Sequence, residues 1–503
     1  MTTLLLAALL AHRTPTLADV IANVRTAVAI TSPIPKWEET DLKGTSQFRG
    51  VSSGYELRFE PNGKFVQAVD SKLGQTFGWD GRNFWEIDLG GATRHLAFED
   101  VDRVQSLVFL LTDFWLDTSA PLDLSLASSA PSKGLYTIIS TSHVSGLEER
   151  IDIDAKTWLP VSAEFDIAAS KTKISLSDWK MAGGIRVPTL ARQTAEGLTD
   201  TFRVEEIHEA KASPASTFTI PAYSPKDIEF RTDLPSSIEC KRAESGHILL
   251  HPLVNGKDIG WFILDSGADS MIIDKAAADT LNLPKIGKET VVGVGGAVQE
   301  PFRTASDLKL GPATMRGLTF LEIDLHALSD LFKVKLAGII GFDFFRRFIV
   351  QVDLKTPAVD LFDVSTYHLQ RGDWSKMEFS SGNPVVQATF EGDRKGWFRL
   401  DTGANGKVVF HSPAVEKLKL LDHRETSAVG MAGVGGTSDA RMGKLAWFEL
   451  GGHRFEAVDA VFSQAKTGAF ADRYLTGNIG QDLMEPFTVV FDFGGSRVAF
   501  LPH

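Results

Sequence analysis

The chain has 503 residues, of which 43% are hydrophobic and 23% are charged, and its formal net charge at pH 7 is -12. This length exceeds what one hydrophobic core usually supports, so we expect two to four domains. The acidic balance argues against nucleic acid or an anionic membrane surface as a partner. The single cysteine, Cys240, excludes an intramolecular disulfide and a zinc site built from several thiolates.

The N-terminus contains a short apolar run, from Leu4 to Leu10, followed by small residues up to Ala18. This pattern predicts a signal peptide over residues 1–18, with cleavage before Asp19, although no basic segment precedes the run. The alternative is an apolar first helix of a cytoplasmic protein. No stretch reaches the roughly 18 uninterrupted apolar residues that a membrane span needs. We therefore expect a soluble bacterial protein that is periplasmic or secreted.

Residues 19–222 have the pattern of an antiparallel β domain. Short alternating runs such as Tyr55–Phe59 and Lys64–Ala68 are broken by turn residues such as Pro-Asn-Gly. The stretch Phe98–Trp115 has helical spacing, which predicts a helix lying across the sheet. Prolines and sparse apolar periodicity in residues 223–237 indicate a linker to the next domain.

The rest of the chain contains an internal repeat. Phe262-Ile-Leu-Asp-Ser-Gly-Ala268 returns as Phe398-Arg-Leu-Asp-Thr-Gly-Ala404. Two glycine segments return in the same order, as Gly293-Val-Gly-Gly296 with Gly433-Val-Gly-Gly436, and as Gly338-Ile-Ile-Gly341 with Gly477-Asn-Ile-Gly480. Two long copies indicate two similar lobes facing each other and not a solenoid. We place these lobes at residues 238–368 and 369–503.

The repeated aspartates, Asp265 and Asp401, are candidates for hydrolysis of a peptide bond. Without a metal or a covalent intermediate, this reaction needs one group that deprotonates water and another that protonates the carbonyl oxygen and the leaving amine. Two carboxyls about 3 Å apart cannot both ionise, so one shared proton supplies both functions. The hydroxyl residue after each aspartate can hydrogen-bond across the junction, and the next glycine brings a backbone N–H close to the carboxylate. The predicted supporting residues are Ser266, Gly267, Thr402 and Gly403.

Residues 246–503 resemble the aspartic proteases of the pepsin and retropepsin clan, in both Asp-Ser/Thr-Gly-Ala motifs and in both Gly-x-Ile-Gly segments. The resemblance implies an all-β dominated, bilobal fold in which each lobe is a retropepsin-like double-ψ β-barrel, preceded here by the antiparallel β-sheet domain. It also implies an aspartic endopeptidase that acts on a peptide or unfolded protein without a cofactor or metal. Because both lobes lie in one chain, as in pepsins, we expect a monomer.

The sequence departs from the pepsin pattern at two kinds of position. Ala268 and Ala404 stand where pepsins usually have Ser or Thr, and alanine there is typical of retropepsins. Loss of that hydroxyl bond to the ionised carboxylate predicts a pH optimum of roughly 4.5 to 6.5, milder than a pepsin's. The two Gly-Val-Gly-Gly segments resemble retropepsin flaps, which predicts two flaps over one cleft. The predicted flap residues are Gly293, Val294, Gly295, Gly296, Gly433, Val434, Gly435 and Gly436.

Residues 19–222 resemble the bacterial lipoprotein-carrier (LolA-like) family in strand order, in the turn Asp154–Pro160 and in the closing Phe218–Pro221. In that family a curved antiparallel sheet wraps helices around an open apolar cavity. Two interpretations stay open: an accessory β domain without a ligand of its own, or a domain that holds an apolar or lipid ligand. For the whole chain, the alternative to a protease is a non-catalytic periplasmic protein that binds or carries a peptide or lipid.

Other motifs give no competing chemistry. No His-Glu-x-x-His pair occurs among the 12 histidines, so we expect His247, His251, His326 and His411 at the surface or in packing. The Ser-Pro pair at Ser412 predicts a short helix over residues 412–418 with Ser412 as its N-cap. The equivalent helix of the first lobe is expected at residues 275–281.

Overall fold

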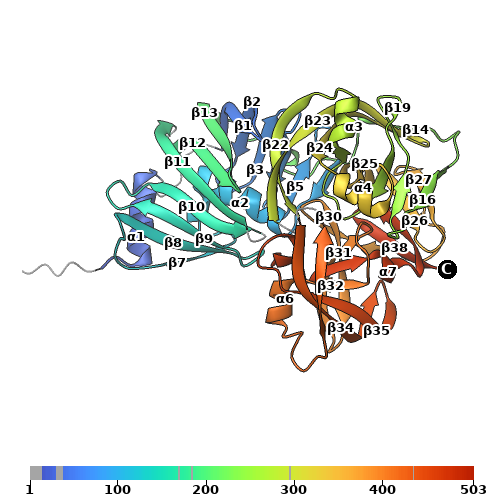
Figure 1. The fold of residues 1–503 in the computed structure, drawn as a ribbon. Helices are drawn as coiled ribbons and strands as arrows, with labels where there is room; N and C mark the ends of the chain where they lie inside the picture. The colour runs from blue at the N-terminus through green and yellow to red at the C-terminus, as the bar shows by residue number, and fades with distance from the viewer. Residues whose placement is uncertain (1–13, 30–37, 168–169, 183–184, 294–295, 434–435) are drawn as a thin grey trace, which may run out of the picture.

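The computed structural model describes residues 14–29, 38–167, 170–182, 185–293, 296–433 and 436–503. Figure 1 shows a broad N-terminal sheet beside two smaller β lobes, so the fold is dominated by strands, as predicted. We call residues 238–368 lobe 1 and residues 369–503 lobe 2, following the predicted boundaries. In the described ranges, no helix is long and apolar enough to span a membrane.

Within the described residues, the N-terminal region forms a 13-stranded antiparallel sheet. The chain runs down the sheet in order from β1 to β6 on one side and from β13 back to β7 on the other, with β1 paired to β13. The strands are β1 (Glu39–Phe48), β2 (Val51–Phe59), β3 (Phe65–Asp70), β4 (Thr76–Trp79), β5 (Phe84–Ile87), β6 (Thr93–His95), β7 (Leu122–Leu126), β8 (Leu135–Ser142), β9 (Glu148–Asp154), β10 (Pro160–Ile167), β11 (Ser170–Ala182), β12 (Ile185–Ala195) and β13 (Leu198–Ala210).

Two helices pack against this sheet. Helix α1 (Leu17–Ala27) begins with a capping box between Thr16 and Asp19 and buries Val20 and Val24. The predicted cleavage site before Asp19 therefore lies in the first turn of α1, while residues 1–13 of the predicted signal peptide lie outside the described residues.

Helix α2 (Glu99–Leu111) confirms the helix predicted from Phe98–Trp115, and a single turn, η1 (Phe114–Leu116), follows it. The last five residues of α2, Leu107–Leu111, are all buried. Aromatic rings fill the space between α2 and the sheet: the ring centroids of Trp79 and Phe109 lie 5.5 Å apart. Among the described residues, side chains of the helices thus fill the space against this sheet.

The two lobes repeat the same mixed strand pairing. In lobe 1, β20 (Trp261–Leu264) pairs parallel with β25 (Leu336–Ile340), β25 pairs antiparallel with β21 (Ile272–Asp274), and β21 pairs parallel with β24 (Ala313–Ile323). In lobe 2, the same order and directions join β31 (Arg394–Asp401), β36 (Gly477–Gly480), β32 (Val408–Phe410) and β35 (His453–Ser463). The internal repeat of the sequence therefore corresponds to a structural repeat.

The strands of the first lobe sheet are β14 (Ile228–Phe230), β16 (Cys240–Arg242), β17 (Ile248–Leu250), β18 (Leu253–Val254), β19 (Lys257–Asp258), β20 (Trp261–Leu264), β21 (Ile272–Asp274), β22 (Lys285–Gly293), β23 (Gly296–Leu310), β24 (Ala313–Ile323) and β25 (Leu336–Ile340). Those of the second lobe sheet are β29 (Glu378–Ser380), β30 (Asn383–Phe390), β31 (Arg394–Asp401), β32 (Val408–Phe410), β33 (Ser427–Gly433), β34 (Gly436–Leu450), β35 (His453–Ser463) and β36 (Gly477–Gly480). The helices are α3 (Lys275–Thr280), α4 (His326–Phe332), α5 (Phe342–Phe345), α6 (Ser412–Lys417) and α7 (Gln481–Met484), and the remaining short turns are η2 (Ala215–Thr217) and η3 (Ala469–Ala471).

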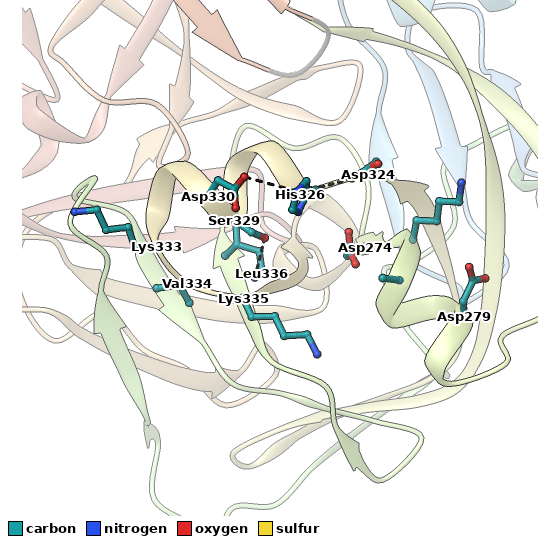
Figure 2. A pocket seen from close by; sticks show the side chains of 12 residues that line it. Asp274, Asp279, Asp324, His326, Ser329, Asp330, Lys333, Val334, Lys335 and Leu336 are labelled. Carbon is teal, nitrogen blue, oxygen red and sulfur yellow. Dashed lines mark hydrogen bonds and ion pairs between the residues drawn. The ribbon is translucent and has the colours of Figure 1, made fainter.

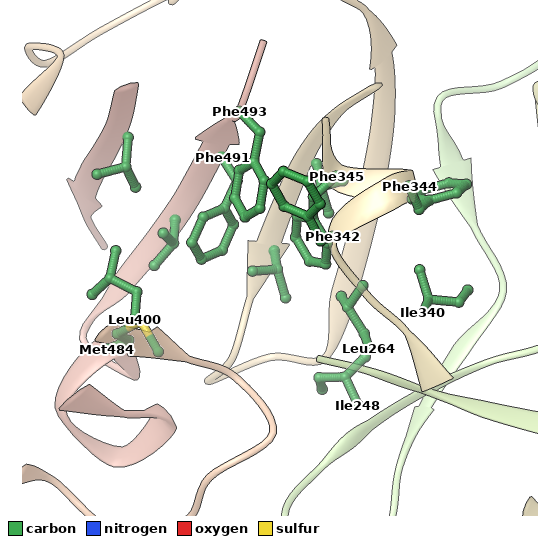
Figure 3. Close-up of a cluster of buried hydrophobic side chains, with 14 of the residues drawn as sticks. Ile248, Leu264, Ile340, Phe342, Phe344, Phe345, Leu400, Met484, Phe491 and Phe493 are labelled. Atoms are coloured by element: carbon green, nitrogen blue, oxygen red, sulfur yellow. The ribbon is translucent and has the colours of Figure 1, made fainter. Parts of the chain in front are cut away.

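A further sheet joins the two lobes. Its order is β15-β27-β26-β37-β38-β28, so three strands from the lobe 1 side and three from lobe 2 form one layer, and the two groups meet where β26 pairs with β37. The strands are β15 (Ser237–Ile238), β26 (Phe348–Asp353), β27 (Ala358–Asp363), β28 (Ser375–Lys376), β37 (Phe487–Asp492) and β38 (Arg497–Pro502). Above it, Phe345 of lobe 1 packs against Phe491 and Phe493 of lobe 2, with centroids 5.5 and 5.0 Å apart, and Figure 3 shows these rings together. This apolar contact fixes the lobes to each other.

The segment 223–237, predicted as a linker, is held against lobe 1. Its strand β14 pairs with β24, and Asp227 accepts a 2.9 Å hydrogen bond from Nε of Arg347. The hydroxyl of Tyr223 donates to the carbonyl of Arg346. Low apolar periodicity indicated the absence of a core helix or strand, but it did not reveal an edge strand that pairs through its backbone.

Buried ion pairs connect the N-terminal sheet to lobe 1. Glu86 of β5 accepts from Nε of Arg94 at 2.8 Å and from Nη1 of Arg346, directly after α5, at 3.1 Å. All three side chains are at most 8% exposed. Burial opposes ionisation of Glu86, but the charges of Arg94 and Arg346 outweigh it and hold the pKa of Glu86 at about 2.

Replacing this carboxylate tests the interface. We expect Glu86→Gln to lower the free energy of unfolding by about 3 kcal/mol at pH 7, because two buried guanidinium groups each lose one of their carboxylate partners. The depressed pKa makes this contribution fully present above pH 4.5 and lost as the pH falls towards 2, so the gap between the two proteins narrows over that range. Urea denaturation at pH 7, 4 and 3 measures it.

The matched control is Glu164→Gln, which breaks exposed pairs with Lys171 and Lys173. It should cost less than about 1 kcal/mol. If both variants lost the same free energy of unfolding, the stabilising role of the buried network would be contradicted.

Candidate active site

The two aspartates end corresponding strands. Asp265 follows β20, and Asp401 is the last residue of β31. In each strand the residues one and three positions before the aspartate, Leu264 with Phe262 and Leu400 with Phe398, are at most 1% exposed. The alternating pattern of a strand thus anchors each loop in the core of its own lobe and turns the next residue towards the junction.

Each carboxyl lies against the glycine of the opposite lobe. A Cβ atom added to Gly403 would lie 2.2 Å from Cγ of Asp265, and one added to Gly267 would lie 2.5 Å from Cγ of Asp401. Only glycine permits this approach. The structure therefore brings Asp265 and Asp401 together as a pair, which we call the dyad, and both carboxyls remain partly exposed.

Reciprocal hydrogen bonds lock the two aspartate loops. The backbone N–H of Ser266 donates to Oγ1 of Thr402 at 2.9 Å, and the N–H of Thr402 donates to Oγ of Ser266 at 3.0 Å. Each hydroxyl also donates across the junction, Ser266 to the carbonyl of Leu400 at 2.8 Å and Thr402 to that of Leu264 at 2.9 Å. These four bonds are the cross-junction contacts expected from the sequence, and both hydroxyl residues are buried.

The dyad is built to hold one proton. Burial first, and then repulsion from Asp401, raise the pKa of Asp265 to about 8, against a hydrogen bond from the N–H of Gly267 that lowers it. Burial also raises the pKa of Asp401, although Arg399 and the N–H of Gly403 oppose the shift. Over a broad range below pH 8 the pair can therefore combine an acid with a base.

Two histidines contact residues of lobe 2 next to Asp401. From the sequence we expected both of them only at the surface or as packing residues. Nε2 of His247 lies 2.9 Å from the carbonyl oxygen of Gly403. His411 is fully buried, and its Nε2 lies 2.9 Å from Oδ1 of Asn478. Nδ2 of the same asparagine donates to Oδ2 of Asp401 at 3.2 Å. The repeat held one signal for this contact, since lobe 1 has Ile339 where lobe 2 has Asn478.

His411 also takes the N-cap position of α6, which the sequence assigned to Ser412. Ser412 is instead the first helical residue, and its hydroxyl donates to the carbonyl of Ala465 at 2.6 Å. The Ser-Pro pair fits either position, because proline is tolerated throughout the first turn. Helix α3 begins at Lys275, as expected, and Asp274 is its N-cap.

The predicted flaps form two hairpins. Strands β22 and β23 pair up to Gly293 and Gly296, and β33 and β34 pair up to Gly433 and Gly436. The remaining predicted flap residues, Val294, Gly295, Val434 and Gly435, lie outside the described residues.

The two hairpins differ in their surroundings. In the first, the N–H of Lys288 donates to the carbonyl of Arg49 at 2.9 Å, and Glu289 forms a 3.0 Å ion pair with Arg49, which lies in the turn between β1 and β2. Nε2 of Gln299 donates to the carbonyl of Glu196 at 3.2 Å. Between the described residues of the second hairpin and the N-terminal sheet, no hydrogen bond or ion pair occurs.

A separate cavity of about 920 Å³ lies on lobe 1 between α3 and α4 (Figure 2). Its lining includes His326 and Lys333. Nε2 of His326 lies 3.7 Å from a carboxylate oxygen of Asp330. Neither aspartate of the dyad lines it. In the part of the chain that the structure describes, no group of three or more His, Cys, Asp or Glu side chains is arranged to hold a metal ion.

The cross-junction bonds give a prediction about stability. We expect Thr402→Val to lower the free energy of unfolding by about 2 kcal/mol, because the buried N–H of Ser266 and carbonyl of Leu264 lose their partner. Thr402→Ser keeps the hydroxyl and is the matched control. Urea denaturation followed by tryptophan fluorescence compares them, and equal stability of the two variants would contradict the role of these bonds.

Comparisons with known proteins agree with the repeat. An aspartyl protease family model matches residues 252–344 and 386–483, one segment in each lobe. Three solved structures are similar: a LolA superfamily protein from Nitrosomonas europaea (12% identity, TM-score 0.30, covering 41% of this chain and 98% of that one), a DUF1329 family protein from Desulfovibrio piger (11%, 0.30, 41% and 98%) and a retropepsin-like aspartic protease from Rickettsia conorii (15%, 0.20, 26% and 96%). No curated protein matches the chain in sequence. Both copies of the repeat, each with its Asp-Ser/Thr-Gly motif, are thus similar to aspartyl proteases.

Proposed function

We propose that the protein is an aspartic endopeptidase, in which Asp265 and Asp401 activate a water molecule that attacks a peptide bond of a peptide or unfolded protein. The observation that carries this proposal is the close approach of each carboxyl to the glycine of the opposite lobe. It gives one pair of carboxyls on partly exposed residues, with raised pKa values, which is what general acid–base hydrolysis needs.

The reaction follows from one shared proton. The ionised carboxyl takes a proton from water as the water oxygen bonds to the carbonyl carbon, and the protonated carboxyl donates its proton to the carbonyl oxygen. The tetrahedral diol then collapses: the C–N bond breaks, the amine nitrogen takes a proton from the first carboxyl, and a diol hydroxyl returns a proton to the second. The dyad ends in its starting state.

The remaining parts of the proposal concern the rest of the chain. The glycine hairpins act as flaps on the substrate, and the N-terminal domain holds the first of them through Arg49 and Glu196. We also propose that the protein is exported, to the periplasm or outside the cell, which the apolar run Leu4–Leu10 supports. We propose that it is a monomer, because one chain contains both aspartate lobes. The packed interior between α2 and the N-terminal sheet favours an accessory role over transport of a lipid.

The proposed dyad is tested by cleavage of casein between pH 3 and 9. We expect hydrolysis with an optimum at pH 4.5 to 6.5 and a decline as the pH rises through about 8, where the dyad loses its shared proton. Asp265→Asn and Asp401→Asn should each reduce kcat/KM by at least about 100-fold, since either change removes the acid–base pair.

The control is Asp459→Asn, an exposed residue that pairs with Lys444 at 2.8 Å on the surface of lobe 2. It should cleave like the unmodified protein. Absence of cleavage at any pH would favour the non-catalytic binding protein, and full activity of either dyad variant would reject the shared mechanism.

A further inference from the structure

The two aspartates of the dyad do not have equal surroundings. Among the described residues, Asp265 accepts one backbone hydrogen bond, from Gly267 at 2.8 Å. Asp401 accepts the equivalent bond from Gly403 at 3.0 Å and a second one from Nδ2 of Asn478 at 3.2 Å. A donor to a carboxylate stabilises its ionised form more than its neutral form.

The asymmetry arises at one repeated position. Asn478 pairs with Val409 in lobe 2, as Ile339 pairs with Ile272 in lobe 1, so Asn478 and Ile339 are structural equivalents. Ile339 carries no donor. Asn478 is only 3% exposed, and a buried amide needs partners for both of its ends.

His411 supplies the second partner and fixes the direction of the amide. Because Nδ2 of Asn478 donates to Asp401, its Oδ1 must accept, and the group 2.9 Å away is Nε2 of His411. His411 must therefore be the tautomer with hydrogen on Nε2. Without this donor, nothing would prevent the amide from turning its oxygen towards Asp401, where it would repel the ionised carboxylate.

The position of His411 shows that its ring serves this contact. Its structural equivalent in lobe 1 is Asp274, which caps α3 by accepting from the N–H of Ala277 at 3.1 Å. His411 makes no such bond to α6. Lobe 2 thus lacks a side-chain cap at this helix and has an imidazole aimed at Asn478 instead.

The charged groups around this contact keep His411 neutral. Burial first, and then the charge of Arg399, lower the pKa of His411 to about 3. On its other side, Nδ1 lies 3.9 Å from Asp472, which is itself close to Glu99 of α2. Burial raises the pKa of both of these carboxyls, which limits their negative charge beside the ring.

The remaining charges near Asp401 are those of Asp265, Arg399 and His247. Arg399 acts on both members of the dyad. It is the strongest influence that lowers the pKa of Asp401, so its charge favours ionisation of Asp401 in the same direction as the amide of Asn478. His247 comes from lobe 1, directly before β17, and lies beside Gly403 of the second aspartate loop. Burial lowers the pKa of His247, so it loses its charge as the pH approaches neutrality.

We propose that Asn478, oriented by His411, is a positioning residue that makes Asp401 the ionised member of the dyad and leaves the shared proton on Asp265. This inference rests on the proposed peptidase function and assigns its two roles. Asp401 takes the proton from water as the new C–O bond forms, and Asp265 gives its proton to the carbonyl oxygen. When the C–N bond breaks, Asp401 passes its proton to the amine nitrogen, and Asp265 regains one from the diol.

The experiment compares full-length Asn478→Leu, His411→Phe and His411→Gln with the unmodified protein. Leucine has the shape of asparagine without its donor, and phenylalanine replaces the ring without Nε2–H. Glutamine can place an amide nitrogen near the position of Nε2. Thermal denaturation verifies that each variant is folded.

The first readout is the pH profile of kcat/KM on casein-derived peptide. We expect Asn478→Leu and His411→Phe to raise the lower apparent pKa of the dyad by about 1 unit, which means about tenfold lower kcat/KM well below that pKa. His411→Gln should restore the profile. A structural role alone would change the rate at all pH values equally, and superimposable profiles of all four proteins would overturn the proposal.

The second readout does not need activity. Titration of ¹³Cγ-labelled aspartate, with resonances assigned through Asp265→Asn and Asp401→Asn, identifies the carboxyl that ionises first. We expect Asp401 to do so in the unmodified protein, and ionisation of Asp265 first would overturn the assignment. If no protein cleaves peptide, the proposed function fails, while this titration still decides the inference. If Asn478→Leu does not fold, the two His411 variants decide the role of the amide.

Discussion

The geometry of the dyad depends on four hydrogen bonds that cross between the aspartate loops. Each loop presents a buried backbone N–H, and among the described residues these two groups donate to the hydroxyls of Thr402 and Ser266 in the opposite lobe. A buried N–H without a partner costs about 1 to 3 kcal/mol, so neither loop can adopt its conformation independently of the other. The same contacts place Gly267 and Gly403 against the facing carboxyls. Stability of the lobe junction and the juxtaposition of the dyad are therefore one property.

The N-terminal sheet is connected to this junction through α5. The N–H of Phe342, the first residue of α5, donates to the carbonyl of Ala268 in the aspartate loop at 2.9 Å. Arg346 follows the end of the same helix and forms the buried ion pair with Glu86. The N-terminal sheet thus contacts lobe 1 one helix away from Asp265. Removal of either charge would leave its partner buried and uncompensated, so this contact couples the N-terminal sheet to lobe 1.

The sequence predicted the features that depend on short motifs and that occur in both lobes. Repeated Asp-Ser/Thr-Gly motifs predicted two lobes and the facing of Asp265 and Asp401, because similar segments fold into similar loops. Contacts between distant positions left no local pattern: Glu86 and Arg346 are 260 residues apart, and His411 and Asn478 are 67 apart. Helix α6 shows the same limit, since Ser412 fits an N-cap by its residue type, while tertiary contacts of His411 determine where the helix begins.

One chain with two lobes can do what two identical chains cannot. In a symmetric dimer every substitution occurs twice, so both aspartates keep equal surroundings and the shared proton has no preferred side. A duplicated chain can alter one copy, and here the altered copy contains Asn478 and His411 where the other has Ile339 and Asp274. Both residues act on one oxygen of Asp401, Asn478 directly and His411 through Asn478. The pair is effective only as a pair, because the amide without the imidazole has no fixed direction and the imidazole without the amide has no path to the carboxylate. Their joint presence in lobe 2 is therefore better explained by the electrostatics of the dyad than by the packing of α6, which loses its cap.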